Sequence, residues 1–67
     1  MKSVIKVANM RTLSDVNKIR EAISNNEGVI ACQISKEKQE VSIVYDTYFL
    51  KEDDIIQCLE DLGYTII

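Results

Sequence analysis

The sequence switches between the two-residue period of β-strands and the longer period of α-helices, and this switching most constrains the fold. Alternating apolar residues, together with a short β-prone end, indicate four strands at residues 2–8, 29–35, 40–46 and 64–67. Apolar residues at helical spacing indicate amphipathic helices at residues 13–25 and 51–62. The expected order of elements is therefore β-α-β-β-α-β.

This order predicts one α+β domain with the ferredoxin-like plan: a four-stranded antiparallel sheet with two helices on one face. Right-handed crossovers place the first and third strands in the middle of that sheet. A chain of 67 residues leaves no room for a second domain, so residues 1–67 form a single unit.

Each element is expected to turn one set of side chains toward the core. The strands supply Ile5 and Val7, then Ile30, Cys32 and Ile34, then Val41, Ile43 and Tyr45. The helices supply Leu13, Val16, Ile19 and Ile23, then Ile55, Ile56, Leu59 and Leu62. On the outer sheet face, a mildly apolar stripe is expected from Val4, Val44 and Ile66. Because this stripe is small, a monomer is favoured over a dimer.

The start of the first helix has the pattern of a capping box. The hydroxyl of Thr12 can accept from the Asp15 amide, and the Asp15 carboxylate can accept from the Thr12 amide. Just before it, Met10 is predicted to fill the core beneath the turn, since methionine often fills irregular gaps.

Composition excludes several function classes. A net charge of -3 argues against a nucleic-acid partner, because such binding depends on basic residues that meet phosphates. The chain has no histidine, which removes histidine-based metal sites and acid–base catalysis. No apolar run is long enough to cross a membrane, and the N-terminus lacks the pattern of a secretory signal. We therefore expect a soluble protein of the cytoplasm.

Several short motifs together resemble the heavy-metal-associated domain of small copper chaperones and P-type ATPase tails. They are Asn9-Met10, Val16-Asn17-Lys18-Ile19, Gly28-Val29, the run 41–46, Asp54-Ile55-Ile56 and the run 60–64. The resemblance covers essentially the whole chain and implies the same fold and a role in metal transport. Its most specific part is Leu62-Gly63-Tyr64.

The metal motif of that family, Gly-Met-Thr-Cys-x-x-Cys, is altered in this chain. Asn9 stands for the glycine, Arg11 for the threonine, and Thr12 and Asp15 for the two cysteines. Soft ions such as Cu(I) select sulfur, and hard cations need more oxygen ligands than this turn offers. No metal or cofactor is therefore expected at Thr12 and Asp15.

Two cysteines remain elsewhere, Cys32 on the core face of the second strand and Cys58 on the inner half of the second helix. In this plan the two lie on different sides of the domain and do not meet. We interpret both as small buried apolar residues rather than as a ligand or redox pair.

Three function classes stay open. The preferred hypothesis is a non-catalytic copper-chaperone-like domain that has lost its Cys-x-x-Cys site and binds a protein partner. The second is a genuine Cu or Zn carrier with non-standard or intersubunit ligands, such as Met10 or a rearranged Cys32. The third is a small-molecule-sensing regulatory domain. An enzyme such as an acylphosphatase shares the element order, but the glycine-rich anion loop it needs is absent, so no enzymatic activity is expected.

The preferred hypothesis places partner binding on one surface. In copper chaperones the matching tyrosine lies beside the metal loop, so the resemblance implies a patch formed by Met10, Arg11, Thr12, Leu13, Asp15 and Tyr64. For Tyr64, a ring packed on the core with its hydroxyl in water is an equal alternative. The partner would be a P-type ATPase or a related metal-homeostasis domain. A start at Met1 and an end after the last strand suit a free-standing protein.

Overall fold

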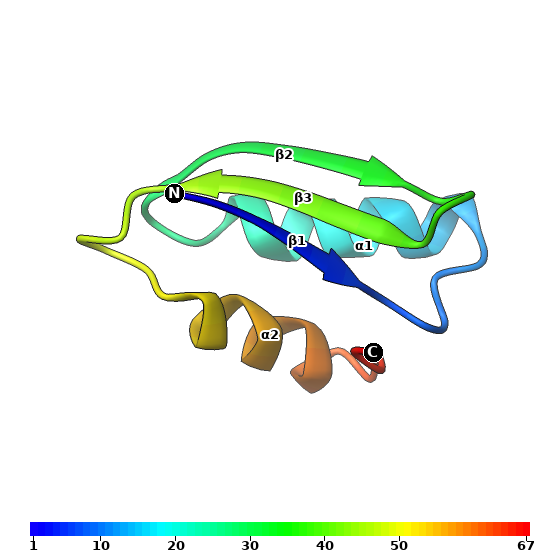
Figure 1. Ribbon diagram of the computed structural model, residues 1–67. Coiled ribbons are helices and arrows are strands. Elements are labelled where there is room, and N and C mark those ends of the chain that lie inside the picture. The colour runs from blue at the N-terminus through cyan, green and yellow to red at the C-terminus, as the bar shows by residue number, and fades with distance from the viewer.

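The computed structural model describes all 67 residues of the chain. Five elements follow one another: β1 (Lys2–Lys6), α1 (Leu13–Ser24), β2 (Val29–Ser35), β3 (Glu40–Tyr45) and α2 (Glu52–Asp61). The β1–α1 loop and the β2–β3 turn lie at one end of the domain, and the β3–α2 loop lies at the opposite end (Figure 1). The predicted helices and the first three predicted strands are confirmed, with ends that shift by at most two residues.

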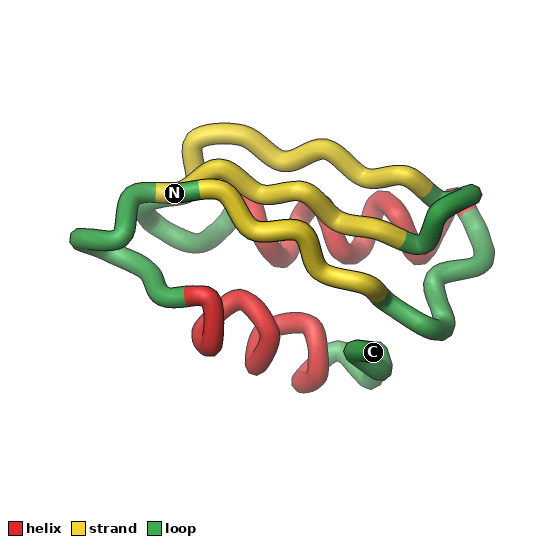
Figure 2. Tube along the Cα trace, viewed as in Figure 1, coloured by secondary structure: helices red, strands yellow, loops and turns green.

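The sheet has three antiparallel strands in the order β1-β3-β2. In β3, Glu40 pairs with Lys6 of β1 on one side and with Ser35 of β2 on the other. The strands run as one curved layer with both helices on the same side (Figure 2). This arrangement leaves the core between the sheet and the helices and leaves the other sheet face in solvent.

The fourth predicted strand does not form. After Gly63 the chain contributes only one isolated bridge, between Val7 and Ile66. Two further backbone bonds tie this segment to the chain beside β1: Ala8 N donates to Thr65 O (2.8 Å) and Ile67 N donates to Lys6 O (3.0 Å). These contacts reach only Lys6, Val7 and Ala8, at and beyond the end of β1, so no ladder forms along that strand and the segment docks as an extended tail.

One buried apolar cluster holds the two layers together. Its members are Ile5, Val7, Met10, Val16, Ile19, Ile23, Val41, Ile43, Tyr45, Leu50, Ile55, Leu59 and Tyr64. The strand residues among them alternate with exposed or half-buried ones, which confirms the predicted core faces of β1 and β3. The hydroxyls of Ser3 and Tyr45, also buried, hydrogen bond to each other at 2.9 Å. Their polar groups therefore enter the core without losing a partner.

The predicted core face of β2 is wrong at one position. Ile30 is 71% exposed, whereas Val29, Cys32 and Ile34 pack against the core. A register shift between Val29 and Ala31 explains this, because one extra residue in the strand reverses the alternation of side chains. A bulge of this kind leaves no mark in the apolar pattern.

Three further apolar residues lie elsewhere than the sequence predicts. Leu13 (68% exposed) and Leu62 (46% exposed) leave the helix stripes because each lies at a helix end, beyond the cover of the sheet. Ile66 packs partly on the core rather than on the outer face, where Val4 is exposed as expected.

Candidate functional site

The turn between β1 and α1 is held from below by Met10. This side chain is fully buried in the core cluster, which confirms the prediction that it fills the space under the turn. Its carbonyl accepts a hydrogen bond from Gln39 Nε2 at 3.3 Å, so the β2–β3 turn braces the same segment. Met10 therefore shapes this end of the domain but offers no side-chain surface to a partner.

The helix start carries the predicted capping box. Asp15 N donates to Thr12 Oγ1 at 3.1 Å, and Thr12 N donates to Asp15 Oδ2 at 3.1 Å. Arg11 N donates to the same carboxylate oxygen at 3.0 Å. Three backbone amides of the turn are thus paired by two side chains, which satisfies donors that a helix start otherwise leaves open.

Tyr64, in the segment that follows α2, closes the turn from a distant part of the sequence. Its ring is 8% exposed, and its hydroxyl donates to Asp15 Oδ1 at 2.8 Å. The ring packs on the core as one of the two sequence hypotheses has it, but the hydroxyl bonds to a carboxylate. Both oxygens of Asp15 are consequently engaged by donors from the protein itself.

These bonds change the acidity of both groups. The Arg11 amide, the Tyr64 hydroxyl and the Thr12 amide stabilise the carboxylate and lower the pKa of Asp15 from 3.8 to about 2. Burial, followed by the bond to Asp15 and its negative charge, raises the pKa of Tyr64 to about 12. At neutral pH the pair is a charged acceptor with a neutral donor.

Asn9 ties the C-terminal tail to the turn. Its side chain donates through Nδ2 to Gly63 O (3.2 Å) and accepts through Oδ1 from Thr65 N (2.8 Å). Sequence reasoning assigned Asn9 only a place in an altered motif and missed this clamp. An asparagine side chain can donate and accept at the same time, and this is the one feature of the sequence that points to such a clamp. Its partners, however, lie more than fifty positions away.

The predicted patch is assembled in part. Thr12, Asp15 and Tyr64 are linked by hydrogen bonds, and Arg11 and Leu13 are exposed on the same turn. Met10 and Tyr64 are buried in the core, so the structure takes both out of the surface patch. We call the exposed set Arg11, Thr12, Leu13 and Ser14 the turn face.

A model of the heavy-metal-associated domain matches residues 4–65, nearly the full length of the chain. The chain belongs to this family. Among curated proteins, no sequence matches it.

The fold of this heavy-metal-associated domain is similar to several solved structures. A CopZ metallochaperone is 22% identical, with full coverage of both chains and a TM-score of 0.96. A copper-binding domain from HMA7, a P-type ATPase, is 26% identical over 98% of this chain and 89% of that one, with a TM-score of 0.93. Apo-CopP from Helicobacter pylori is 28% identical over the full length of both, with a TM-score of 0.88.

The donor atoms at the turn of this heavy-metal-associated domain do not suit a soft metal ion as cargo. They are a hydroxyl and a carboxylate, and both already hold the helix cap. Nowhere in the chain do three cysteine, aspartate or glutamate side chains gather so that they can hold a metal ion. Soft ions prefer thiolates, so the turn as folded offers such an ion no favourable ligand.

The two cysteines are separate and free. Cys32 is half-buried on β2, and desolvation raises the pKa of its thiol, although the charge of Arg20 opposes this effect. Cys58 lies between the helices, where its thiol donates to Ala22 O and accepts from Asn26 Nδ2, both at 3.8 Å. Cys32 is not part of any group of three possible ligands, so as folded it offers a metal ion a single thiol.

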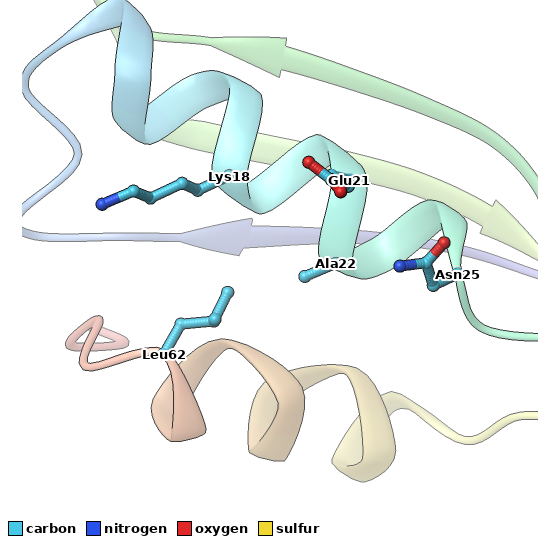
Figure 3. Close-up of a pocket in the computed structure, with 5 residues that line it drawn as sticks. All are labelled: Lys18, Glu21, Ala22, Asn25 and Leu62. Atoms are coloured by element: carbon cyan, nitrogen blue, oxygen red, sulfur yellow. The ribbon is translucent and has the colours of Figure 1, made fainter.

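A shallow hollow of about 280 Å³ lies between the two helices. It is lined by Lys18, Glu21, Ala22, Asn25 and Leu62. Ala22 and Leu62 face each other across it, whereas the charged ends of Lys18 and Glu21 extend away from Leu62 (Figure 3). Small-molecule sites need a few polar groups that converge, and these two charged groups diverge.

Neither helix of the domain has the length and apolar character needed to span a membrane. The helices have 12 and 10 residues, and each has an exposed polar face.

Proposed function

We propose that this protein is a non-catalytic heavy-metal-associated domain whose β1–α1 turn no longer binds Cu(I) and instead docks a protein partner through the turn face. The observation that carries the proposal is the engagement of Asp15, whose two oxygens accept from Arg11 N, Thr12 N and Tyr64 Oη. A metal ion that bound this carboxylate would compete with those bonds, and the bond from Thr12 N is part of the helix cap.

The turn face has the features of a docking surface. Leu13 is 68% exposed beside the exposed cation Arg11, while the capping bonds fix the backbone beneath them. An exposed leucine on a rigid turn gains apolar contact on binding without an ordering cost. The family supports a metal-homeostasis protein as partner, since one similar structure is a domain of a P-type ATPase and another is a metallochaperone.

A Cu(I) titration against a chromophoric chelator tests the first half of the proposal. The reduced parent is expected not to compete, and the Thr12→Cys/Asp15→Cys variant is expected to bind tightly, because the fold then presents two thiolates. The matched control is Thr12→Ser/Asp15→Ser, which has side chains of the same shape as the first variant but places oxygen where that variant has sulfur. Tight binding by the parent would contradict the proposal and point to Cys32 or Cys58.

An NMR titration tests the docking half. The ¹⁵N-labelled protein is mixed with the heavy-metal-associated domain of a P-type ATPase from the same organism, without metal. The expected shifts fall on Arg11–Ser14, and Leu13→Ser weakens binding while Val4→Ser, on the outer sheet face, leaves it unchanged. An equal loss of affinity in both variants, or no change in any chemical shift, would count against docking of this partner to the turn face.

A further inference from the structure

The β3–α2 loop lies at the end of the domain opposite the β1–α1 loop (Figure 1), and it carries two exposed aromatic side chains. Tyr48 is 86% exposed and Phe49 is 52% exposed. Their rings meet edge to face, with centroids 5.1 Å apart and an interplanar angle of 78°. The chain has only four aromatic residues, so half of them lie on this loop rather than in the core. Aromatic rings stabilise mainly when buried, which makes the pair a candidate contact surface.

The loop that carries the rings is held rigidly. Asp46 accepts three bonds, from Tyr48 N at its side chain (2.9 Å) and from Phe49 N and Leu50 N at its carbonyl (3.1 and 3.2 Å). Leu50 is buried and anchors the loop in the core. The backbone of Gly28 lies so close that a Cβ there would sit 2.7 Å from Phe49 Cβ. The backbone that carries the rings is therefore held in place, and binding need not order it first.

Acidic residues flank the aromatic pair along the chain and at the neighbouring Gly28. Asp46 begins the loop, Glu52 and Asp53 begin α2, and Glu27 precedes the glycine that contacts Phe49, all four of them exposed. Two cations also lie at this loop: Lys51, the one basic residue in the stretch from Asp46 to Asp54, and the Met1 ammonium, which donates to Tyr45 O at 3.0 Å; the acidic side chains outnumber them. Aromatic faces attract cations through the ring quadrupole, and arginine combines that contact with hydrogen bonds to carboxylates.

We infer that the β3–α2 loop is a second docking site, and that it binds an arginine- or lysine-bearing segment of a protein partner. Tyr48 and Phe49 contact the cation, and the four carboxylates attract it and compensate its charge. The site involves neither the turn face nor any metal, so it holds or fails independently of the function proposed above.

The test uses an acetylated, amidated peptide of alternating arginine and glycine, titrated into the ¹⁵N-labelled protein at low ionic strength. Saturable shifts are expected at Gly28 and at residues 46–53. The Tyr48→Leu variant is expected to bind about two- to five-fold more weakly, the equivalent of one exposed cation–π contact. Tyr48→Phe, which keeps the ring, is expected to bind like the parent. Because Tyr48 is almost fully exposed, both variants fold.

The same peptide with citrulline in place of arginine tests the charge, and its binding at equal strength would overturn the inference. Equal affinity of Tyr48→Leu and the parent would do so as well, since the ring would then play no part. Shifts spread over Glu60 and Asp61 as strongly as over the loop would show non-specific attraction. Loop shifts caused by raised protein concentration alone, without peptide, would assign the surface to a second copy instead.

Discussion

The Tyr64 hydroxyl donates to Asp15 Oδ1 at 2.8 Å and so joins the start of α1 to the segment that follows α2. The two residues are 49 positions apart, and Asn9 adds two bonds to the same tail. The turn that carries the proposed docking surface is consequently stabilised by the segment after α2 as well as by its own capping bonds. Changes in this network are expected to alter stability and surface shape together.

Replacing Thr12 with alanine removes the side-chain acceptor for the Asp15 amide. The expected loss of unfolding free energy is about 1 kcal/mol, the usual cost of an N-cap. Urea denaturation followed by circular dichroism measures it. Ser14→Ala, at an exposed position two residues further on, is the control, and equal midpoints for the two variants would show that the cap contributes nothing.

Acid should weaken the domain through Asp15. Its pKa in the folded protein, about 2, lies below the ordinary value of 3.8, so the carboxylate binds protons more readily after unfolding. The stability that the Asp15 carboxylate gives the folded protein is complete above about pH 4 and is lost as the pH falls toward 2. The difference in urea midpoint between the parent and Asp15→Asn should therefore shrink over that range. A difference that stays constant down to pH 2 would contradict this.

Tyr64→Phe keeps the packed ring and removes the hydroxyl. The pKa of Asp15 is expected to rise from about 2 but to stay below 3.8, because the bonds from Arg11 N and Thr12 N remain. Carboxyl ¹³C shifts followed against pH measure this directly. An unchanged Asp15 titration in the variant would mean that the hydroxyl does not reach the carboxylate in solution.

The fold follows from the sequence as far as local patterns reach. Residues Val16, Ile19 and Ile23 repeat at helical spacing, and Thr12 and Asp15 specify a cap through contacts only three positions apart. The errors arise where the deciding contact is distant or irregular. The bulge that exposes Ile30 and the single bridge of Ile66 depend on how strands meet, which no local pattern records.

The candidate site divides in the same way. The capping pair could be predicted because both partners are near in sequence, and Met10 could be placed beneath the turn because of its position at the end of a strand. The bond from Tyr64 and the clamp by Asn9 could not, since each joins residues about fifty positions apart. The exposure of Tyr48 and Phe49 could not be predicted either, because no local pattern separates an exposed aromatic residue in a loop from a buried one.

Met10→Ala tests the support under the turn. The side chain is fully buried, so its truncation is expected to cost about 2–5 kcal/mol, which approaches the whole stability of so small a domain. Met10→Leu nearly conserves volume and should cost less than about 1.5 kcal/mol. Thermal unfolding of both variants measures the contrast. Equal and small losses would show that Met10 is not tightly packed.

Gly28→Ala tests how the start of β2 is fitted against the β3–α2 loop. Gly28 and Gly63 both have positive φ, +99° and +94°, a region that costs other residues roughly 1–2 kcal/mol. Around Gly63 a new Cβ meets nothing within 4 Å, whereas at Gly28 it would lie 2.7 Å from Phe49 Cβ. Gly63→Ala should therefore show the backbone cost alone, and Gly28→Ala should lose more stability and shift the amide signals of Tyr48 and Phe49. Equal urea midpoints for the two variants would mean that Phe49 moves aside freely, and the rigid presentation of the aromatic pair would then be wrong.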